Sequence, residues 1–232
     1  MKKTISLILA LVLCLSLCAC SGGETEKVPA EVDELAFLTE ATWGKVFDGK
    51  TKLKFAEDGT GTYSDKELTW EMWDGAVVFR YTSTSYYGNT SLIEVTCNII
   101  EHNGIKMLVS DGAIYVPGTN FKEGCAAAKE YMISVAEELN WADAYAQYQS
   151  NAARAEAEYD GKIVKWTATI FEISESSCRM ANETYNGLAL NAVDVYMDTE
   201  ELVKLDKDQE VTVIGFMDVG SFSHIFCGFV VE

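Results

Sequence analysis

Alternating apolar and polar positions dominate the chain between residues 36 and 118. Residues 52–55 read Lys-Leu-Lys-Phe, which is the period of a strand with one dry and one wet face. Further short runs follow, separated by Asp58-Gly59, Asp74-Gly75, Asn103-Gly104 and Asp111-Gly112. Such dipeptides supply the positive φ angles of tight hairpin turns. The pattern therefore predicts an antiparallel meander of about six to eight strands, curled into a small barrel or sandwich.

A helical period replaces this alternation between residues 119 and 160, where we expect a helical connector. Apolar and aromatic residues recur there at steps of four and three, along one stripe: Trp141, Tyr145, Tyr148, Ala152, Ala155 and Tyr159. Asn140 suits the N-cap, with Asp143 three residues later, and Gly161 suits a left-handed stop. Residues 125–139 leave two interpretations open, a separate helix or a helix that becomes extended at residues 132–135.

The pattern returns to strands over residues 161–232. The first strand, residues 163–173, changes the face of its apolar residues after Ile170, as at a β-bulge. Further strands are predicted over residues 178–182, 192–198, 209–217 and 223–231. Asp198 can cap a short helix, residues 199–205, between the third and fourth strands. This is the plan of a five-stranded OB-fold barrel, so the expected fold class is mainly β, with some α in the connector.

The chain opens with a leader. Lys2 and Lys3 precede a short apolar run that ends in Leu-Cys-Ala-Cys at Cys20. A basic start, a short apolar core and small residues before the cut are typical of a secretory signal peptide. The run is shorter than the roughly 20 residues of a membrane span. An uncleaved anchor or a buried helix would be the alternative interpretation.

The ending of the leader resembles the bacterial lipobox, in which the cysteine becomes the lipidated N-terminus. This resemblance implies a signal peptide over residues 1–19, lipid attachment at Cys20 and a tether over residues 20–35. We therefore predict an extracytoplasmic protein, anchored by lipid to the bacterial cell membrane.

Charge argues against one class of partner. The chain carries 18 Lys and Arg against 36 Asp and Glu, a net charge of −18. Four aromatic residues of the C-terminal region would supply stacking for bases: Trp166, Tyr196, Phe216 and Phe222. Single-stranded nucleic acid also requires a basic groove, however, and an acidic surface repels phosphates. No nucleic-acid partner is therefore expected.

Metal and catalytic chemistry have little support in the sequence. The chain has only two histidines and no metal-ligand spacing, and the acidic run at residues 206–210 lacks the glycine and distal glutamate of a calcium loop. No nucleophile motif or phosphate loop is present, so neither a cofactor nor a metal is expected.

Four cysteines remain after the leader, namely Cys97, Cys125, Cys178 and Cys227. Export permits three disulfide pairings among them, but Cys178 and Cys227 lie in apolar strand-like stretches, which favours free, buried thiols.

Two family resemblances add to this picture. Trp43-Gly44, the Asp-Gly-Thr-Gly-Thr-Tyr run at residues 58–63 and Leu68-Thr69-Trp70 resemble small lipocalin-like domains of exported bacterial proteins. Such domains often hold apolar ligands. The resemblance therefore makes five aromatic residues candidates for lining a cavity: Trp43, Trp70, Trp73, Phe79 and Tyr81. For a barrel this small, the favoured interpretation is that they simply fill the core.

The second resemblance runs from about Tyr148 to the C-terminus and so includes the whole C-terminal region, residues 161–232. Ala155, Tyr159, Gly161-Lys162 and Val164, with the segment 205–215, are similar to the tRNA_anti-like OB-fold family. Gln209 and Ala168 depart from it, where the family tends to have glycine. Members are commonly exported or lipid-anchored proteins of unassigned activity.

From these patterns we expect a non-enzymatic binding or protein-interaction module in the cell envelope. Its partner would be an envelope protein or a small ligand. A carrier of a small apolar ligand in the N-terminal β domain is the first alternative. A carboxylate-based enzyme, which would need clustered carboxylates with raised pKa values in a cleft, is the weaker one.

Overall fold

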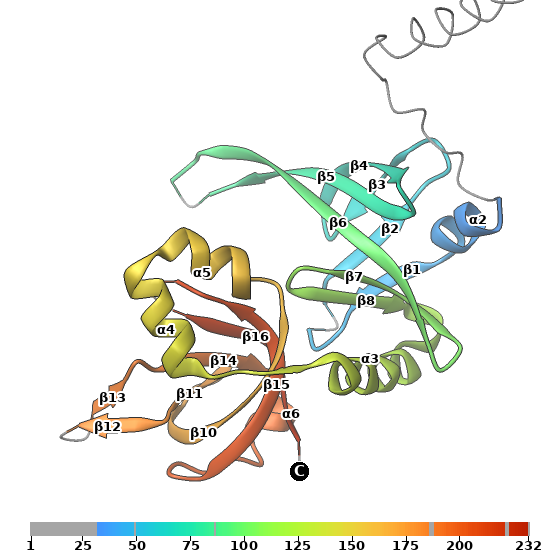
Figure 1. The fold of residues 1–232 in the computed structure, drawn as a ribbon. Coiled ribbons are helices and arrows are strands. Elements are labelled where there is room, and N and C mark those ends of the chain that lie inside the picture. Colours follow the sequence, from blue (N-terminus) through green and yellow to red (C-terminus); the bar gives the residue numbers. More distant parts are fainter. Residues whose placement is uncertain (1–31, 49, 86, 186–187, 221–222, 232) are drawn as a thin grey trace, which may run out of the picture.

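Two β-barrels follow one another along the chain (Figure 1). The structure is a computed structural model that describes residues 32–48, 50–85, 87–185, 188–220 and 223–231. Cys20, the predicted leader and most of the predicted tether lie outside the described residues. The predicted fold class is confirmed: the fold is mainly β, with an eight-stranded antiparallel barrel, a helical connector and a five-stranded barrel.

The first barrel is a simple meander. Its strands are β1 (Thr42–Lys45), β2 (Lys52–Phe55), β3 (Thr60–Tyr63), β4 (Lys66–Trp73), β5 (Ala76–Thr84), β6 (Thr90–His102), β7 (Ile105–Ser110) and β8 (Ala113–Pro117). Each strand pairs with the next, and β8 pairs with β1 to close the barrel. The predicted turns are present, because Asn103 and Gly104 both have positive φ, 52° and 74°, as the two-residue turn between β6 and β7 requires.

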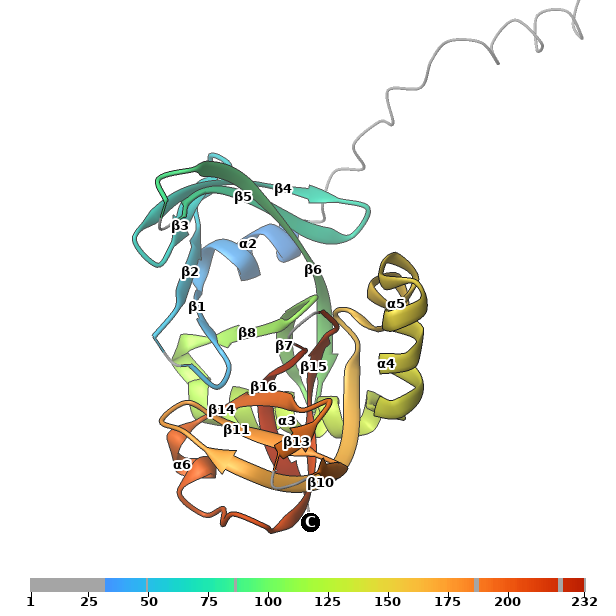
Figure 2. The same ribbon diagram turned by 90° about the vertical axis from the view of Figure 1, so that its left-hand side faces the viewer.

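Helix α2 (Val32–Glu40) precedes this barrel and was not predicted from the sequence. Figure 2 shows α2 under the arch of β4 and β5. Leu38 is fully buried in the barrel core, and the indole N–H of Trp43 donates to its carbonyl at 3.2 Å. The start of α2 lies in the segment that we interpreted as a tether, so helical structure is already present before residue 36.

Helices form the connector, as expected. It comprises the 3-10 turn η1 (Gly118–Asn120), α3 (Phe121–Val135), the short strand β9 (Glu137–Glu138), α4 (Trp141–Ser150) and α5 (Ala152–Tyr159). Residues 132–135 are helical, which decides between the two interpretations. Asn140 caps α4 by accepting from the Asp143 N–H at 3.3 Å. The aromatic stripe is divided at Asn151, whose side chain accepts from the Arg154 N–H at 3.1 Å and begins a new helix.

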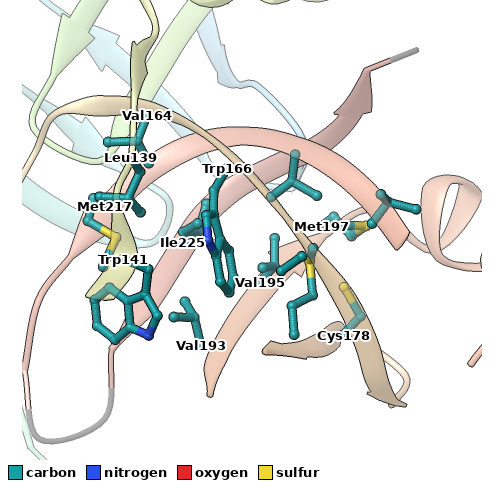
Figure 3. Close-up of a cluster of buried hydrophobic side chains, with 14 of the residues drawn as sticks. Leu139, Trp141, Val164, Trp166, Cys178, Val193, Val195, Met197, Met217 and Ile225 are labelled. Atoms are coloured by element: carbon teal, nitrogen blue, oxygen red, sulfur yellow. The ribbon is translucent and has the colours of Figure 1, made fainter. Parts of the chain in front are cut away.

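The second barrel has the OB strand order. Its strands are β10 (Ile163–Ile173), β11 (Ser177–Ala181), β14 (Val193–Met197), β15 (Glu210–Asp218) and β16 (His224–Val231), with α6 (Thr199–Leu202) between β14 and β15. They pair in the order β11-β14-β16-β15-β10, and β10 also pairs with β11 to close the barrel. The bulge predicted in the first strand lies between Ile170 and Glu172. Figure 3 shows the core inside this barrel, around Trp166.

Two small strands between β11 and β14 form a hairpin that the sequence did not predict. They are β12 (Glu183–Tyr185) and β13 (Leu188–Leu190), and among the described strands they pair only with each other.

A separate apolar cluster joins the two barrels through α3. Its fully or almost fully buried members come from both barrels and the helix: Val46, Met107, Ile114, Val116, Ala128, Met132, Ile214, Phe216 and Phe229. The close approach of α3 to β8 depends on Gly124, because a Cβ placed there would lie 2.7 Å from the Cβ of Val116. The two barrels and α3 therefore share one apolar cluster.

Candidate functional site

The five aromatic residues proposed to line a cavity occupy different environments in the first barrel. Trp43 and Phe79 are fully buried, Trp70 is 7% exposed and Tyr81 is half-buried. Trp73 is 45% exposed, because it ends β4 beside the Asp74-Gly75 turn. The structure therefore brings four of the five into the barrel core and leaves Trp73 at its rim.

Ring contacts fill the interior around these four residues. The Phe55 ring lies 5.0 Å from Trp70 and 6.1 Å from Phe79, and Phe79 lies 6.2 Å from Tyr81. Burial raises the pKa of the Tyr115 phenol far above its ordinary value, as expected of a group enclosed by apolar side chains. These contacts favour the interpretation in which the aromatic side chains fill the core.

A polar groove lies on the outside of the second barrel, where β10, β11 and β14 run side by side. Its volume is about 280 Å³, and we call it the outer groove; its lining is Glu172, Ser174, Ser177, Arg179, Asp194 and Tyr196. Strand alternation puts these side chains outside. On β14, for example, Val193 and Val195 point into the barrel core, whereas Asp194 and Tyr196 point outward.

Arg179 is the centre of the charged part of the outer groove. Its guanidinium donates two hydrogen bonds to Asp194, from Nε at 2.9 Å and from Nη2 at 3.1 Å. On the other side, Nη1 lies 3.5 Å from a carboxylate oxygen of Glu172. The three residues face one another across neighbouring strands. The hydrogen bonds from Arg179 to Asp194 raise the pKa of the guanidinium and hold its plane in place.

Tyr196 supplies the aromatic part of the outer groove. Its ring stacks on Phe226 of β16, with 5.3 Å between centroids and 17° between planes. The His224 ring lies 5.5 Å from both of these rings, so the three form a triangular cluster. The His224 imidazole is also within 3.6 Å of the Asp218 carboxylate. Tyr196 therefore has a fixed orientation while it lines the groove.

Two serine hydroxyls close one end of the groove at the β10–β11 turn. The Ser174 hydroxyl accepts from the Ser177 N–H at 3.1 Å and lies 2.9 Å from the Ser177 hydroxyl. The outer groove thus offers hydroxyl, carboxylate and guanidinium groups beside one aromatic ring. The sequence had suggested Tyr196 as a stacking residue, but Trp166 and Phe216 are buried and Phe222 lies outside the described residues.

Arg179 and its two carboxylates were missed in the sequence. They lie on three strands, and only the pairing register brings them together. A single charged residue on a strand gives no such signal, because its neighbour across the sheet is distant along the chain.

Metal ligands and disulfides are the remaining possibilities raised by the sequence. Within the described ranges, no three or more His, Cys, Asp or Glu side chains are grouped to hold a metal ion. The four described cysteines are free thiols, and burial raises the pKa of Cys97 to about 12. None of the described helices is both long enough and apolar enough to cross a membrane.

Comparisons with known proteins give no relative. No family model, no curated protein and no solved structure matches the chain.

Proposed function

We propose that the chain is a lipid-anchored protein of the cell envelope that binds a neutral oligosaccharide in the outer groove without catalysing a reaction. The anchor is the lipid expected on Cys20. The observation that carries the proposal is the arrangement of Arg179, Asp194 and Tyr196 in one polar groove on the OB barrel.

The hydrogen-bonding groups of the outer groove suit a ligand rich in hydroxyl groups. Carboxylate oxygens of Glu172 and Asp194 accept from hydroxyls, and the Arg179 fork donates to hydroxyl and ether oxygens. The Ser174 hydroxyl donates to the Ser177 carbonyl at 3.0 Å and lies 2.9 Å from the Ser177 hydroxyl, so these two groups offer acceptor oxygens to a ligand. Because Arg179 is already held by its two carboxylates, these groups keep their positions before a ligand arrives.

Charge and shape narrow the class of ligand that the outer groove can bind. Two carboxylates and one guanidinium leave one net negative charge in the groove, which repels phosphate and carboxylate groups. The Tyr196 ring offers an apolar face against which the C–H face of a sugar ring can pack. A volume of about 280 Å³ lies near the lower end of small-molecule sites, about 300 Å³. One sugar ring of a longer chain would occupy it.

Titration calorimetry with three neutral tetrasaccharides, chitotetraose, cellotetraose and maltotetraose, tests the proposal. We expect at least one to bind. Tyr196→Ala should then raise the Kd about twofold to tenfold, since an aromatic contact contributes roughly 0.5–1.5 kcal/mol. Tyr87→Ala is the matched control, because Tyr87 is 87% exposed and lies outside the groove. Absence of binding by all three sugars, or equal affinity of the Tyr196→Ala protein, would refute the proposal.

A further inference from the structure

Strand β6 is longer than β7, its neighbour on one side. It pairs with β5 from Thr90 to Asn98, but it pairs with β7 only from Asn98 to His102. Within the part of the chain that the structure describes, no strand pairs with the other side of residues 90–97. Figure 1 shows the result, a β5–β6 ribbon that projects from the first barrel. We call this one-sided stretch the β6 edge.

The register shows which backbone groups the β6 edge presents. The two-residue turn at Asn103-Gly104 makes His102 and Ile105 a hydrogen-bonded pair, so even-numbered residues of β6 face β7. At the other end of the strand, the Ser85 N–H donates to the Asn89 carbonyl, so odd-numbered residues face β5. The outward N–H and C=O groups of the β6 edge therefore belong to four residues: Thr90, Leu92, Glu94 and Thr96.

The β6 edge lacks the usual protection of an exposed strand. Residues 90–96 read Thr-Ser-Leu-Ile-Glu-Val-Thr, with neither proline nor lysine, and most of them favour strands. Leu92 is 70% exposed although it is apolar. Glu94 is the single charged residue, and the Arg80 Nε donates to it at 2.6 Å, which compensates its charge within the ribbon.

We propose that the β6 edge binds an extended segment of another protein, which adds to the barrel as one more strand. Unpaired N–H and C=O groups in a row select an extended chain, because only a strand satisfies them all. Leu92 selects an apolar side chain on the incoming strand.

Charge distinguishes this partner from a second copy of the chain. The chain has a net charge of −18, so two copies repel one another, whereas a segment with basic side chains is attracted. The partner that fits is therefore an extended segment in which apolar and basic residues alternate. This surface is separate from the outer groove, and the inference does not depend on the sugar proposal.

A display library of random ten-residue peptides on the mature protein is the probe. Selected peptides should alternate apolar and polar positions, carry Lys or Arg, and bind with an affinity that depends on the β6 edge. Leu92→Pro removes one outward N–H, and proline is tolerated at an edge position whose N–H faces solvent. We expect Leu92→Pro to bind the peptides about tenfold more weakly than Leu92→Ala, which keeps the N–H but also lacks the leucine side chain.

Three outcomes would overturn the inference. The first is a library that yields no enriched peptide, and the second is equal binding by Leu92→Pro and Leu92→Ala. The third is a dimer of the wild type in sedimentation equilibrium that Leu92→Pro abolishes, which would make a second copy the occupant. Far-ultraviolet circular dichroism and the melting temperature of both variants confirm that the barrel is intact.

Discussion

Phe229→Ala tests whether the two barrels act as one folding unit. The Phe229 side chain belongs to β16, is 2% exposed and stacks on Phe47 of the first barrel, with 5.6 Å between centroids. The Lys129 ammonium of α3 lies 5.1 Å from the Phe229 ring and 5.5 Å from the Phe47 ring. One side chain thus connects both barrels and the connector.

The expected loss of stability in Phe229→Ala follows from the burial of the phenylalanine side chain. Truncation of a buried phenylalanine costs about 3–5 kcal/mol, which includes the cavity that remains. The cation–π contact with Lys129 belongs to the same loss and is worth about 0.5–1 kcal/mol where partly exposed. Since a folded domain has only about 5–15 kcal/mol of stability, the free energy of unfolding should fall by a large fraction. Both barrels should lose this stability together, because the lost contacts join one barrel to the other.

Urea denaturation, followed by fluorine NMR of 5-fluorotryptophan, is the assay. Trp43 and Trp70 report on the first barrel, and Trp141 and Trp166 report on the second. Phe171→Ala is the control, since Phe171 also carries a lysine, Lys207, over its ring at 5.4 Å but is only partly buried.

We expect Phe229→Ala to lower the urea midpoint of all four signals, and Phe171→Ala to change it little. The reasoning is refuted if the signals of the first barrel keep their wild-type midpoint in Phe229→Ala while those of the second shift.

Three further predictions concern packing, ionisation and anchoring. Gly124→Ala should lower the free energy of unfolding by about 1–3 kcal/mol, because its Cβ would lie 2.7 Å from Val116, and urea denaturation measures it. Burial raises the pKa of Cys97 to about 12 and that of Cys178 to about 11 from an ordinary 9.0, so the folded protein keeps protons that the unfolded chain releases. Stability should therefore be unaffected by these thiols below pH 9 and fall from about pH 9 to 12. Denaturation across this range should show a smaller fall for Cys97→Ala. Cys20→Ala should leave the protein unprocessed or in the soluble fraction, because lipid burial supplies about 0.8 kcal/mol per methylene. Membrane fractionation equal to that of the wild type would contradict the anchor.

Local chemistry explains what the sequence predicted correctly. The turn dipeptides have few backbone alternatives: Asn103-Gly104 and Asp74-Gly75 adopt the positive φ angles that a two-residue hairpin demands. The change of apolar face after Ile170 likewise has one simple explanation, a bulge, and the structure has it there.

Contacts between distant segments explain what the sequence could not predict. On β15, Val213 to Met217 are all buried, because Val213 and Met217 face the barrel interior while Ile214 and Phe216 face the first barrel. The sequence shows a continuous apolar run, but it does not name the partner of the outer face. The outer groove could not be predicted for the same reason, since only strand pairing brings Arg179 beside its two carboxylates.

The most direct test of the proposed function is a titration of ¹⁵N-labelled mature protein with chitotetraose, cellotetraose and maltotetraose, followed by amide chemical shifts. We predict that at least one sugar shifts the amides of β10, β11 and β14 around Arg179 and Tyr196, and leaves those inside the first barrel unchanged. No shift with any sugar, or shifts confined to the first barrel around Phe79, would contradict the account.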